Sequence, residues 1–281
     1  MASFITVDYD FFPPHEMYKE VEFPDGKTAH GMFVYDWQMC ENRAPLFDAV
    51  IWETRCTNFK RWGLDIVART APTLSVEDFA NRVSAQMDDY SSPNLWRSDS
   101  HAWAGILAKD YAGLNGPLSV VNFDSHHDLG YHPTALEPFK ASGRVACDDW
   151  ALIGLHEGWI ENYTLVYPDW QGLAEWSPGV KKLTKDFRKR IHITTWSDWH
   201  DEIPECEVMH FCRSSAWVPP WLDEGFTKLH EEFGWAECLD CTMGQHNSPY
   251  DTCKVRDWDW KLVNENIAQR IDMIAAVELL Q

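Results

Sequence analysis

A short apolar stretch over residues 118–123 is followed directly by Asp124, His126 and Asp128. The stretch comes after a Gly-Pro pair and has the length and composition of a buried strand. Because side chains alternate along a strand, the three polar side chains can converge if the extended geometry continues past residue 123. Carboxylates and imidazoles bind divalent metal ions. The pattern therefore predicts half of a metal site; the alternative is a polar turn whose aspartates cap a helix.

A second pair of aspartates lies within the apolar stretch 4–12, which a Pro-Pro pair stops. Asp8 and Asp10 are two residues apart, so we expect them on one face near the end of a strand. A buried carboxylate without a partner is costly. These two could complete the site begun by Asp124, or they could hydrogen-bond a neighbouring loop.

Other polar residues stand where helices are expected to begin. His101 directly precedes a helical pattern over 102–111, which suits a further metal ligand or an ordinary satisfied polar residue. Asp148 and Asp149 stand before another predicted helix. Carboxylates are favourable at helix N-termini, so capping is the simplest role for this pair.

The elements that must position these residues alternate between strands and helices. Strands are expected at 4–12, 118–123, 163–167, 190–196 and 207–212, and helices at 75–90, 102–111, from about 150, and at 261–280. This alternation is typical of an α/β fold with a mainly parallel sheet and crossover helices, which binds ligands at the carboxyl ends of its strands. One domain over 1–281 is the simplest organisation. Residues 15–72, with strand-like segments at 31–35 and 47–52, are expected to form an insertion or a lid.

Composition limits the classes of partner. With 24 Lys and Arg against 44 Asp and Glu the net charge is −20, which argues against nucleic acid and suits a cationic partner. No apolar stretch approaches the ~20 residues that span a bilayer, and a basic, apolar signal segment is missing. We therefore expect a cytoplasmic protein with no membrane partner, in which the cysteines are thiols or metal ligands. A homo-oligomer is left open.

A separate zinc site is weakly indicated near the C-terminus. Cys238 and Cys241 form a CxxC pair, with His246 and Cys253 downstream. Such a pair with loosely spaced partners suits structural zinc, but unrelated thiols explain it equally well.

Taken together, the motifs resemble the arginase/agmatinase (ureohydrolase) superfamily, and most of all its divergent peptide arginase branch. The resemblance covers about residues 1–12 and 97–225 and is carried by Asp8-Tyr9-Asp10-Phe11-Phe12, Asp99-Ser100-His101, Asp124-Ser125-His126-His127-Asp128-Leu129, Asp148-Asp149-Trp150 and Cys212-Arg213-Ser214-Ser215. It implies a three-layer αβα fold of the arginase and deacetylase kind. The Asp-x-Asp strand, late in the chain of ordinary members, would here be permuted to the N-terminus.

The resemblance also implies an activity: manganese-dependent hydrolysis of the guanidino group of peptidyl arginine in a ribosomally made precursor peptide, giving ornithine and urea. Two Mn²⁺ ions ~3.5–4 Å apart would activate a bridging water. The implied metal ligands are Asp8, Asp10, His101, Asp124, His126 and Asp128. Asp149, or else Asp148 or Glu16, would orient the guanidinium. His127 or His132 would shuttle the proton.

The sequence departs from the family pattern at two places, and the second bears on the substrate. Position 13 is Pro13, where the family motif Asp-x-Asp-x-x-Asp has its third Asp. The loop after Asp128 lacks the Asn/Ser/Thr-rich segment with which free-arginine enzymes hold amino and carboxylate groups, which favours a peptide substrate. The alternatives are a ureohydrolase for free arginine, agmatine or another small guanidino compound, and a non-catalytic metal protein that binds Arg-rich peptides.

Overall fold

A computed structural model gives the structure of the protein. It describes residues 2–14, 52, 54–57, 59–60, 63, 65–87, 93–132, 134–171, 183–203, 206–233 and 239–240. The predicted strand at 31–35, nearly all of the one at 47–52, most of the expected insertion at 15–72 and the predicted helix at 261–280 lie outside these residues.

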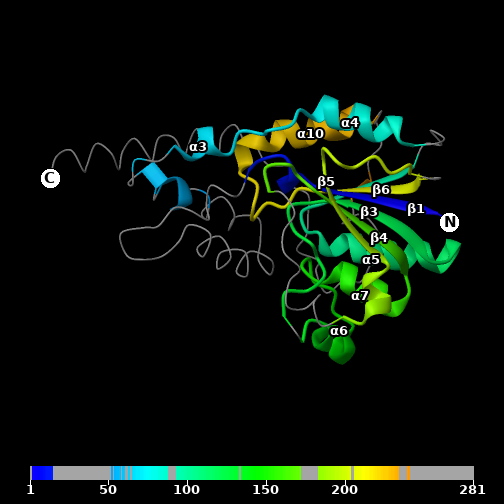
Figure 1. The fold of residues 1–281 in the computed structure, drawn as a ribbon. Helices are drawn as coiled ribbons and strands as arrows, with labels where there is room; N and C mark the ends of the chain where they lie inside the picture. The colour runs from blue at the N-terminus through cyan, green and yellow to red at the C-terminus, as the bar shows by residue number, and fades with distance from the viewer. Residues whose placement is uncertain are drawn as a thin grey trace.

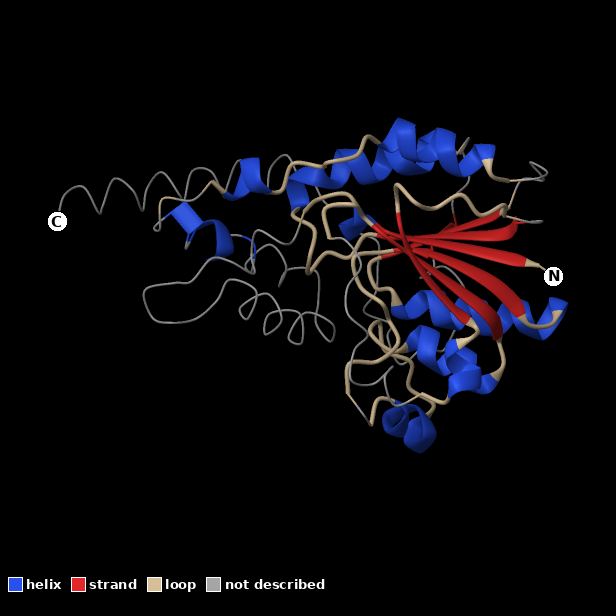
Figure 2. Cartoon of the chain, in the orientation of Figure 1, coloured by secondary structure: helices blue, strands red, loops and turns tan. Residues whose placement is uncertain are grey.

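The described part of the chain is built on one parallel sheet (Figure 2). Its strand order is β5-β4-β3-β1-β6-β2-β7, and every neighbouring pair is parallel. The strands are β1 (Ser3–Asp8), β2 (Asn94–Ser98), β3 (Leu118–Phe123), β4 (Ile160–Tyr167), β5 (Ile191–Thr195), β6 (Cys206–Cys212) and the two-residue β7 (Leu239–Asp240). Because all strands run in one direction, their carboxyl ends meet at a single edge of the sheet.

Helices cover both faces of this sheet, which gives three layers (Figure 1). Helices α5 (Ala102–Asn115) and α7 (Trp150–Glu157) lie on one face, with α6 (Leu136–Ser142) against α7. Helices α4 (Val76–Ala85) and α10 (Asp223–Glu232) pack together on the other face. The α/β prediction with a mainly parallel sheet is therefore confirmed. Within the part of the chain that the structure describes, no helix has the length and apolar character needed to cross a membrane.

Alternation along β1 divides its side chains between two buried apolar clusters. Phe4 packs into the cluster beneath α5 and α7, whereas Ile5 and Val7 pack into the cluster beneath α4 and α10. Thr6 and Asp8 therefore face the same side of the sheet as Phe4, toward the start of α5. A buried apolar strand thus carries two polar side chains toward one face.

The remaining elements are short. They are the 3-10 turns η1 (Tyr9–Phe11) and η3 (Pro220–Leu222) and the one-turn helices α3 (Ile66–Arg69) and α9 (Lys185–Arg188). Ser75 caps α4 as predicted, because its side chain accepts a hydrogen bond from the backbone N–H of Asp78. The described part of this helix ends at Ala85, earlier than the predicted residue 90.

The opening strand is shorter than its apolar sequence suggests. We predicted a strand over 4–12, but β1 ends at Asp8 and the chain turns into η1. The cause is local: the Asp8 carboxylate accepts a hydrogen bond from the backbone N–H of Asp10, which stabilises the turn. Asp10 therefore reaches its position from a turn and not from the face of a strand.

Candidate metal centre

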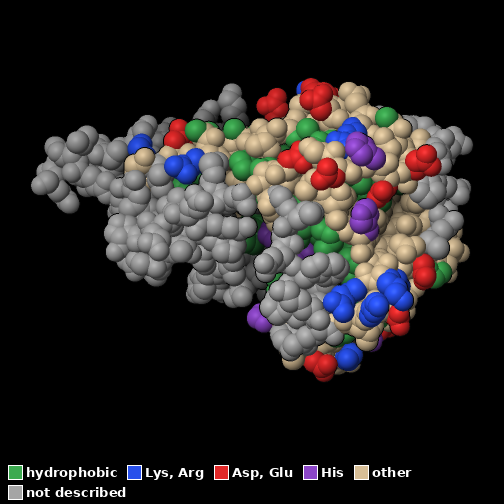
Figure 3. Space-filling model, viewed as in Figure 1, with side chains coloured by type: hydrophobic (Ala, Val, Ile, Leu, Met, Phe, Trp, Pro, Cys, Tyr) green, Lys and Arg blue, Asp and Glu red, His purple; other side chains and the backbone are tan. Residues whose placement is uncertain are grey.

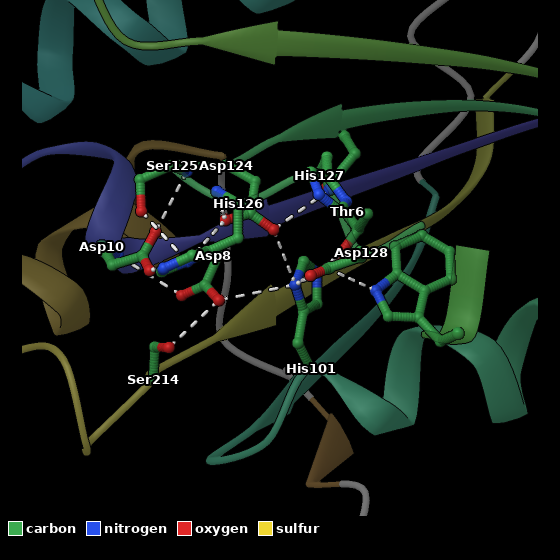
Figure 4. Close-up of polar contacts among 12 residues, drawn as sticks. Thr6, Asp8, Asp10, His101, Asp124, Ser125, His126, His127, Asp128 and Ser214 are labelled. Carbon is green, nitrogen blue, oxygen red and sulfur yellow. Dashed lines mark hydrogen bonds and ion pairs between the residues drawn. The ribbon is translucent and has the colours of Figure 1, made fainter. Parts of the chain in front are cut away.

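Six predicted ligands meet at the carboxyl edge of the sheet (Figure 4). Two come from the end of β1 and the turn after it, one from the residue before α5, and three from the loop after β3. Four of them are carboxylates and two are imidazoles. We refer to them as the Asp/His cluster: Asp8, Asp10, His101, Asp124, His126 and Asp128.

An inner group surrounds Nδ1 of His101. This nitrogen lies 3.0 Å from Oδ2 of Asp124 and 3.4 Å from Oδ2 of Asp8. Oδ2 of Asp128 lies 2.9 Å from the same atom. Asp8, His101 and Asp124 each offer a ligand atom within 4.8 Å of the others, and all three are buried.

An outer group lies around His126. Its Nδ1 is 2.9 Å from Oδ2 of Asp10 and 3.6 Å from Oδ1 of Asp124. The side chain of His126 is 27% exposed, whereas those of Asp10 and Asp124 are fully buried. Asp124 thus belongs to both groups, with one oxygen toward each histidine.

The loop after β3 brings its ligands together by turning, not by continuing the strand. The strand ends at Phe123, and Oδ1 of Asp124 accepts a hydrogen bond from the backbone N–H of His126 at 2.7 Å. Such Asx turns are a common local use of aspartate. The prediction that the extended strand geometry continues past residue 123 is therefore wrong. The side chains of Asp124, His126 and Asp128 nevertheless converge, as predicted.

Backbone strain is concentrated at this site. Among the described residues, the non-glycine residues with positive φ are Asp128 at 50° and Ser214 at 51°. The Ser214 hydroxyl donates to Oδ2 of Asp8 at 3.0 Å, and the indole N–H of Trp150 donates to Oδ2 of Asp128 at 2.6 Å. Left-handed non-glycine residues cost roughly 1–3 kcal/mol each and gather at functional sites. The sequence resemblance included Ser214 and Trp150 but gave them no role.

A row of buried polar residues supports the cluster from behind. Asn122, Thr6 and His210 are register partners across β3, β1 and β6. The Asn122 side chain donates to Oδ2 of Asp124 at 3.1 Å, and Thr6 Oγ1 lies 2.8 Å from Nε2 of His101. We did not predict this row. The available signal was strand alternation, because Thr6 and Asn122 stand two residues before Asp8 and Asp124 on otherwise apolar strands.

Burial and mutual repulsion raise the pKa values of Asp8 and Asp128, whereas two histidines lower the pKa of Asp124. Burial, together with the neighbouring carboxylates, raises the pKa of Asp8 well above its ordinary value. Burial and the charge of Asp124 raise the pKa of Asp128 to about 8. Burial acts on Asp124 as well, but the close contacts with His101 and His126 and the charge of these two rings hold its pKa below the usual range. Asp124 is therefore the carboxylate that ionises most readily.

The two histidines respond to the carboxylates around them. Burial by itself would lower the pKa of His101, but Asp128 and Asp124 raise it well above the ordinary value. The pKa of His126 is raised in the same way, against the effect of burial, mainly by Asp10. Without bound cations, protons on the histidines therefore balance part of the carboxylate charge.

The residues present fit a divalent metal. Nδ1 of His101 is buried among carboxylate oxygens, yet it makes no hydrogen bond of good geometry with the described residues. A ring nitrogen and carboxylate oxygens that converge on one point in this way form a metal-ligand set. The prediction that the cluster can hold a metal is thus confirmed for Asp8, His101 and Asp124 and for Asp10, Asp124 and His126.

The predicted proton-shuttling histidines lie in different environments. His127 is buried and stacks on Tyr131 at 4.1 Å, and its Nδ1 accepts a hydrogen bond from the backbone N–H of Leu129 at 3.0 Å. Burial, aided by the charge of His126, lowers the pKa of His127 to about 4. The ring is therefore neutral at pH 7 and carries its proton on Nε2. His132 is exposed.

The predicted guanidinium-orienting carboxylate lies at the start of α7. Asp149 is 5% exposed, and its Oδ1 accepts a hydrogen bond from the backbone N–H of Ala146 at 2.9 Å. Its neighbour Asp148 is half-buried, and burial raises the pKa of that carboxyl. The third candidate, Glu16, lies outside the described residues, as do Cys238, Cys241, His246 and Cys253.

Comparisons of the chain with protein-family models, with curated proteins and with solved structures gave no match. The chemistry of the Asp/His cluster and the motifs that surround it are therefore the basis for a proposal about function.

Proposed function

We propose that the protein is a manganese-dependent hydrolase that removes the guanidino group of peptidyl arginine as urea and leaves ornithine. The observation that carries the proposal is the position of Asp124, which belongs to two histidine-containing ligand groups. A shared carboxylate suits two ions side by side. The four carboxylates of the cluster would balance the charge of two divalent ions, and the mixture of carboxylate and imidazole ligands suits Mn²⁺.

Each ligand group would hold one ion. Asp8, His101 and Asp124 would hold the inner ion, with Asp128 as a further ligand because its Oδ2 lies 2.9 Å from Nδ1 of His101. Asp10, Asp124 and His126 would hold the outer ion. When bound, the ions would supply the Lewis acidity that lowers the pKa of water and stabilises negative charge during hydrolysis.

The surrounding residues would orient the guanidinium and handle its proton. Asp149 is a buried carboxylate in a segment tied to the cluster, because the backbone N–H of Ala151 donates to the carbonyl of Asp128 at 3.2 Å. We assign Asp149 to orienting the guanidinium. Since neutral His127 has a proton on Nε2, it suits donating a hydrogen bond to the substrate. Exposed His132 is the better candidate for protonating the departing amine.

The net charge and an indole ring beside His126 support a cationic substrate. The chain carries a net charge of −20, and on the face shown in Figure 3 acidic side chains are spread widely, with a smaller group of Lys and Arg. Trp217 packs against His126 with ring centroids 4.8 Å apart, next to the more exposed ligand group. Guanidinium groups stack well on indole rings, so Trp217, although largely buried, is our candidate for contacting the arginine beside His126.

To test this proposal, the full chain and Mn²⁺ are incubated with a library of synthetic peptides, each of which contains arginine. Mass spectrometry should find a ~42 Da loss per modified arginine, the mass lost when a guanidino group becomes an amine, together with urea. The matched control is the same library with lysine in place of arginine, which should stay unchanged. Free arginine and agmatine, tested in parallel, separate the peptide substrate from the small-molecule alternative.

Each other outcome rejects part of the proposal. Urea from free arginine or agmatine alone would replace the peptide substrate with a small guanidino compound. Binding of Mn²⁺ and of the arginine peptides without urea would leave a non-catalytic metal protein. Failure of the chain to bind any Mn²⁺ would reject the metal centre itself.

A further inference from the structure

A series of hydrogen bonds runs into the sheet from Nε2 of His101, the ring nitrogen that faces away from the carboxylates. Nε2 of His101 lies 2.8 Å from Oγ1 of Thr6, which lies 3.0 Å from Nδ1 of His210. Nε2 of His210 lies 2.8 Å from Oγ of Ser98, whose hydroxyl donates to the carbonyl of Ser100 at 2.8 Å. The side chains of Thr6, His210 and Ser98 are fully buried.

The donor and acceptor of each hydrogen bond in this series can be deduced by starting from Ser98. The Ser98 proton goes to the Ser100 carbonyl, so the Ser98 oxygen must accept from Nε2–H of His210. His210 is buried between the hydroxyls of Thr6 and Ser98, which disfavours a charged ring and leaves Nδ1 as an acceptor. The Thr6 hydroxyl must then donate to Nδ1 of His210.

The same deduction reaches the metal centre. Since the single proton of Thr6 points to His210, its oxygen accepts from Nε2–H of His101. Nδ1 of His101 is thereby directed at Asp8, Asp124 and Asp128. Metal-binding histidines commonly have their orientation fixed through the other ring nitrogen.

We propose that Thr6, His210 and Ser98 form a relay that holds His101 in its metal-binding tautomer and orientation. The relay thereby sets the affinity of the inner ligand group for Mn²⁺. The proposal rests on the metal centre proposed above. These three are positioning residues, because they act through His101 and do not touch the metal.

The sheet makes the relay rigid. Thr6 on β1 pairs with His210 on β6, and β6 pairs in turn with β2, which carries Ser98. The relay residues are therefore fixed by backbone ladders on three adjacent strands (Figure 4 shows Thr6 beside the cluster). The outer ligand His126 lies in a loop and is partly exposed, so the relay acts on only one of the two ligand groups.

Thr6→Val tests the relay, because valine keeps the branched shape and removes the hydroxyl. Thr6→Ser is the matched control, because it keeps the hydroxyl. Titration with Mn²⁺ should show affinity at the inner group weakened by roughly 10–100-fold in Thr6→Val, and by less than about tenfold in Thr6→Ser. Affinity at the outer group should change less in both variants.

A second measurement is independent of metal and activity. Proton NMR of the metal-free wild type should show slowly exchanging imidazole N–H protons of His101 and His210. The His101 proton should persist in Thr6→Ser and exchange rapidly in Thr6→Val, because only valine removes the oxygen that accepts it. If Thr6→Val does not fold, Ser98→Ala tests the relay from its far end, with exposure of the His210 N–H proton to exchange as the expected result.

Equal Mn²⁺ affinity in Thr6→Val and wild type, with protected imidazole protons in both, would overturn the relay and leave the metal centre intact. A wild type that binds no Mn²⁺ would instead overturn the metal centre. The two failures are therefore distinguishable.

Discussion

Asp124 and His101 are joined through Oδ2 and Nδ1 at 3.0 Å, although they come from different elements of the sheet edge. The other oxygen of Asp124 lies 3.6 Å from Nδ1 of His126. Hydrogen bonds from Asn122 and from the backbone of His126 fix both oxygens of this carboxylate. The arrangement makes Asp124 the residue on which both ligand groups depend.

Asp124→Ala should therefore abolish binding at both groups and leave a folded protein. Asp10→Ala should remove the outer ion and retain the inner one, because Asp10 belongs to the outer group alone. Metal content by plasma mass spectrometry and circular dichroism check these outcomes. Full metal content in Asp124→Ala would contradict the shared role of this carboxylate.

Metal should stabilise the fold, because the cations offset repulsion among buried carboxylates. At free Mn²⁺ a hundred times the dissociation constant, linkage gives about 2.7 kcal/mol per ion. For a chain of 281 residues that corresponds to a rise in Tm of about 5 °C per ion. Scanning calorimetry with Mn²⁺ and then with excess chelator measures the change; a Tm that responds to neither would count against the metal centre.

The stabilisation of the fold by bound metal should increase with pH. Burial raises the pKa of Asp128 to about 8, so the folded, metal-free protein holds this proton more tightly than the unfolded chain does. A raised pKa gives stability that is present below the unfolded value and lost as the pH rises toward 8. The raised pKa values of Asp8, His101 and His126 act in the same direction. The lowered pKa of Asp124 acts only at acid pH.

Metal binding needs the deprotonated ligands, so Mn²⁺ affinity should instead rise across the same window, on the order of tenfold from pH 6.5 to pH 8 for Asp128 alone. Tm values with Mn²⁺ and with chelator at several pH values test this. The gap between them should widen from pH 6.5 to pH 8 and should widen less in Asp128→Asn. A gap that stays constant in the wild type would show that these carboxyl groups do not titrate with metal binding.

Asp149→Asn should reduce urea release by at least about a hundredfold and leave metal stoichiometry unchanged. The reason is that Asp149 is assigned to the guanidinium, whereas the metal is assigned to the Asp/His cluster. Asparagine keeps an oxygen that can accept the hydrogen bond from Ala146. Turnover and metal content should be measured on the same samples. Loss of metal would place Asp149 among the ligands and remove it from substrate binding.

Much of the site was predictable because a buried strand and the polar residues at its end can be recognised from neighbouring residues in the sequence. The apolar stretches before Asp8 and Asp124 predict buried strands, and strand ends in a parallel sheet share one edge. His101 was a ligand candidate because it directly precedes a predicted helix. These expectations required only the types and spacing of neighbouring residues, and they name the ligands in both groups that the structure brings together.

The tertiary structure decided which strands are neighbours and what lies behind the ligands. The position of β1 between β3 and β6 brings Ser214 onto Asp8 across 206 positions and sets His210 beside Thr6. Turns formed by Asp8 and Asp124, and not extended strands, aim Asp10 and His126. Covalent geometry fixes which side chains share a face of a strand. Strand pairing and loop conformation depend on contacts between distant segments, so the relay and the strained positions at Asp128 and Ser214 emerge only in the folded chain.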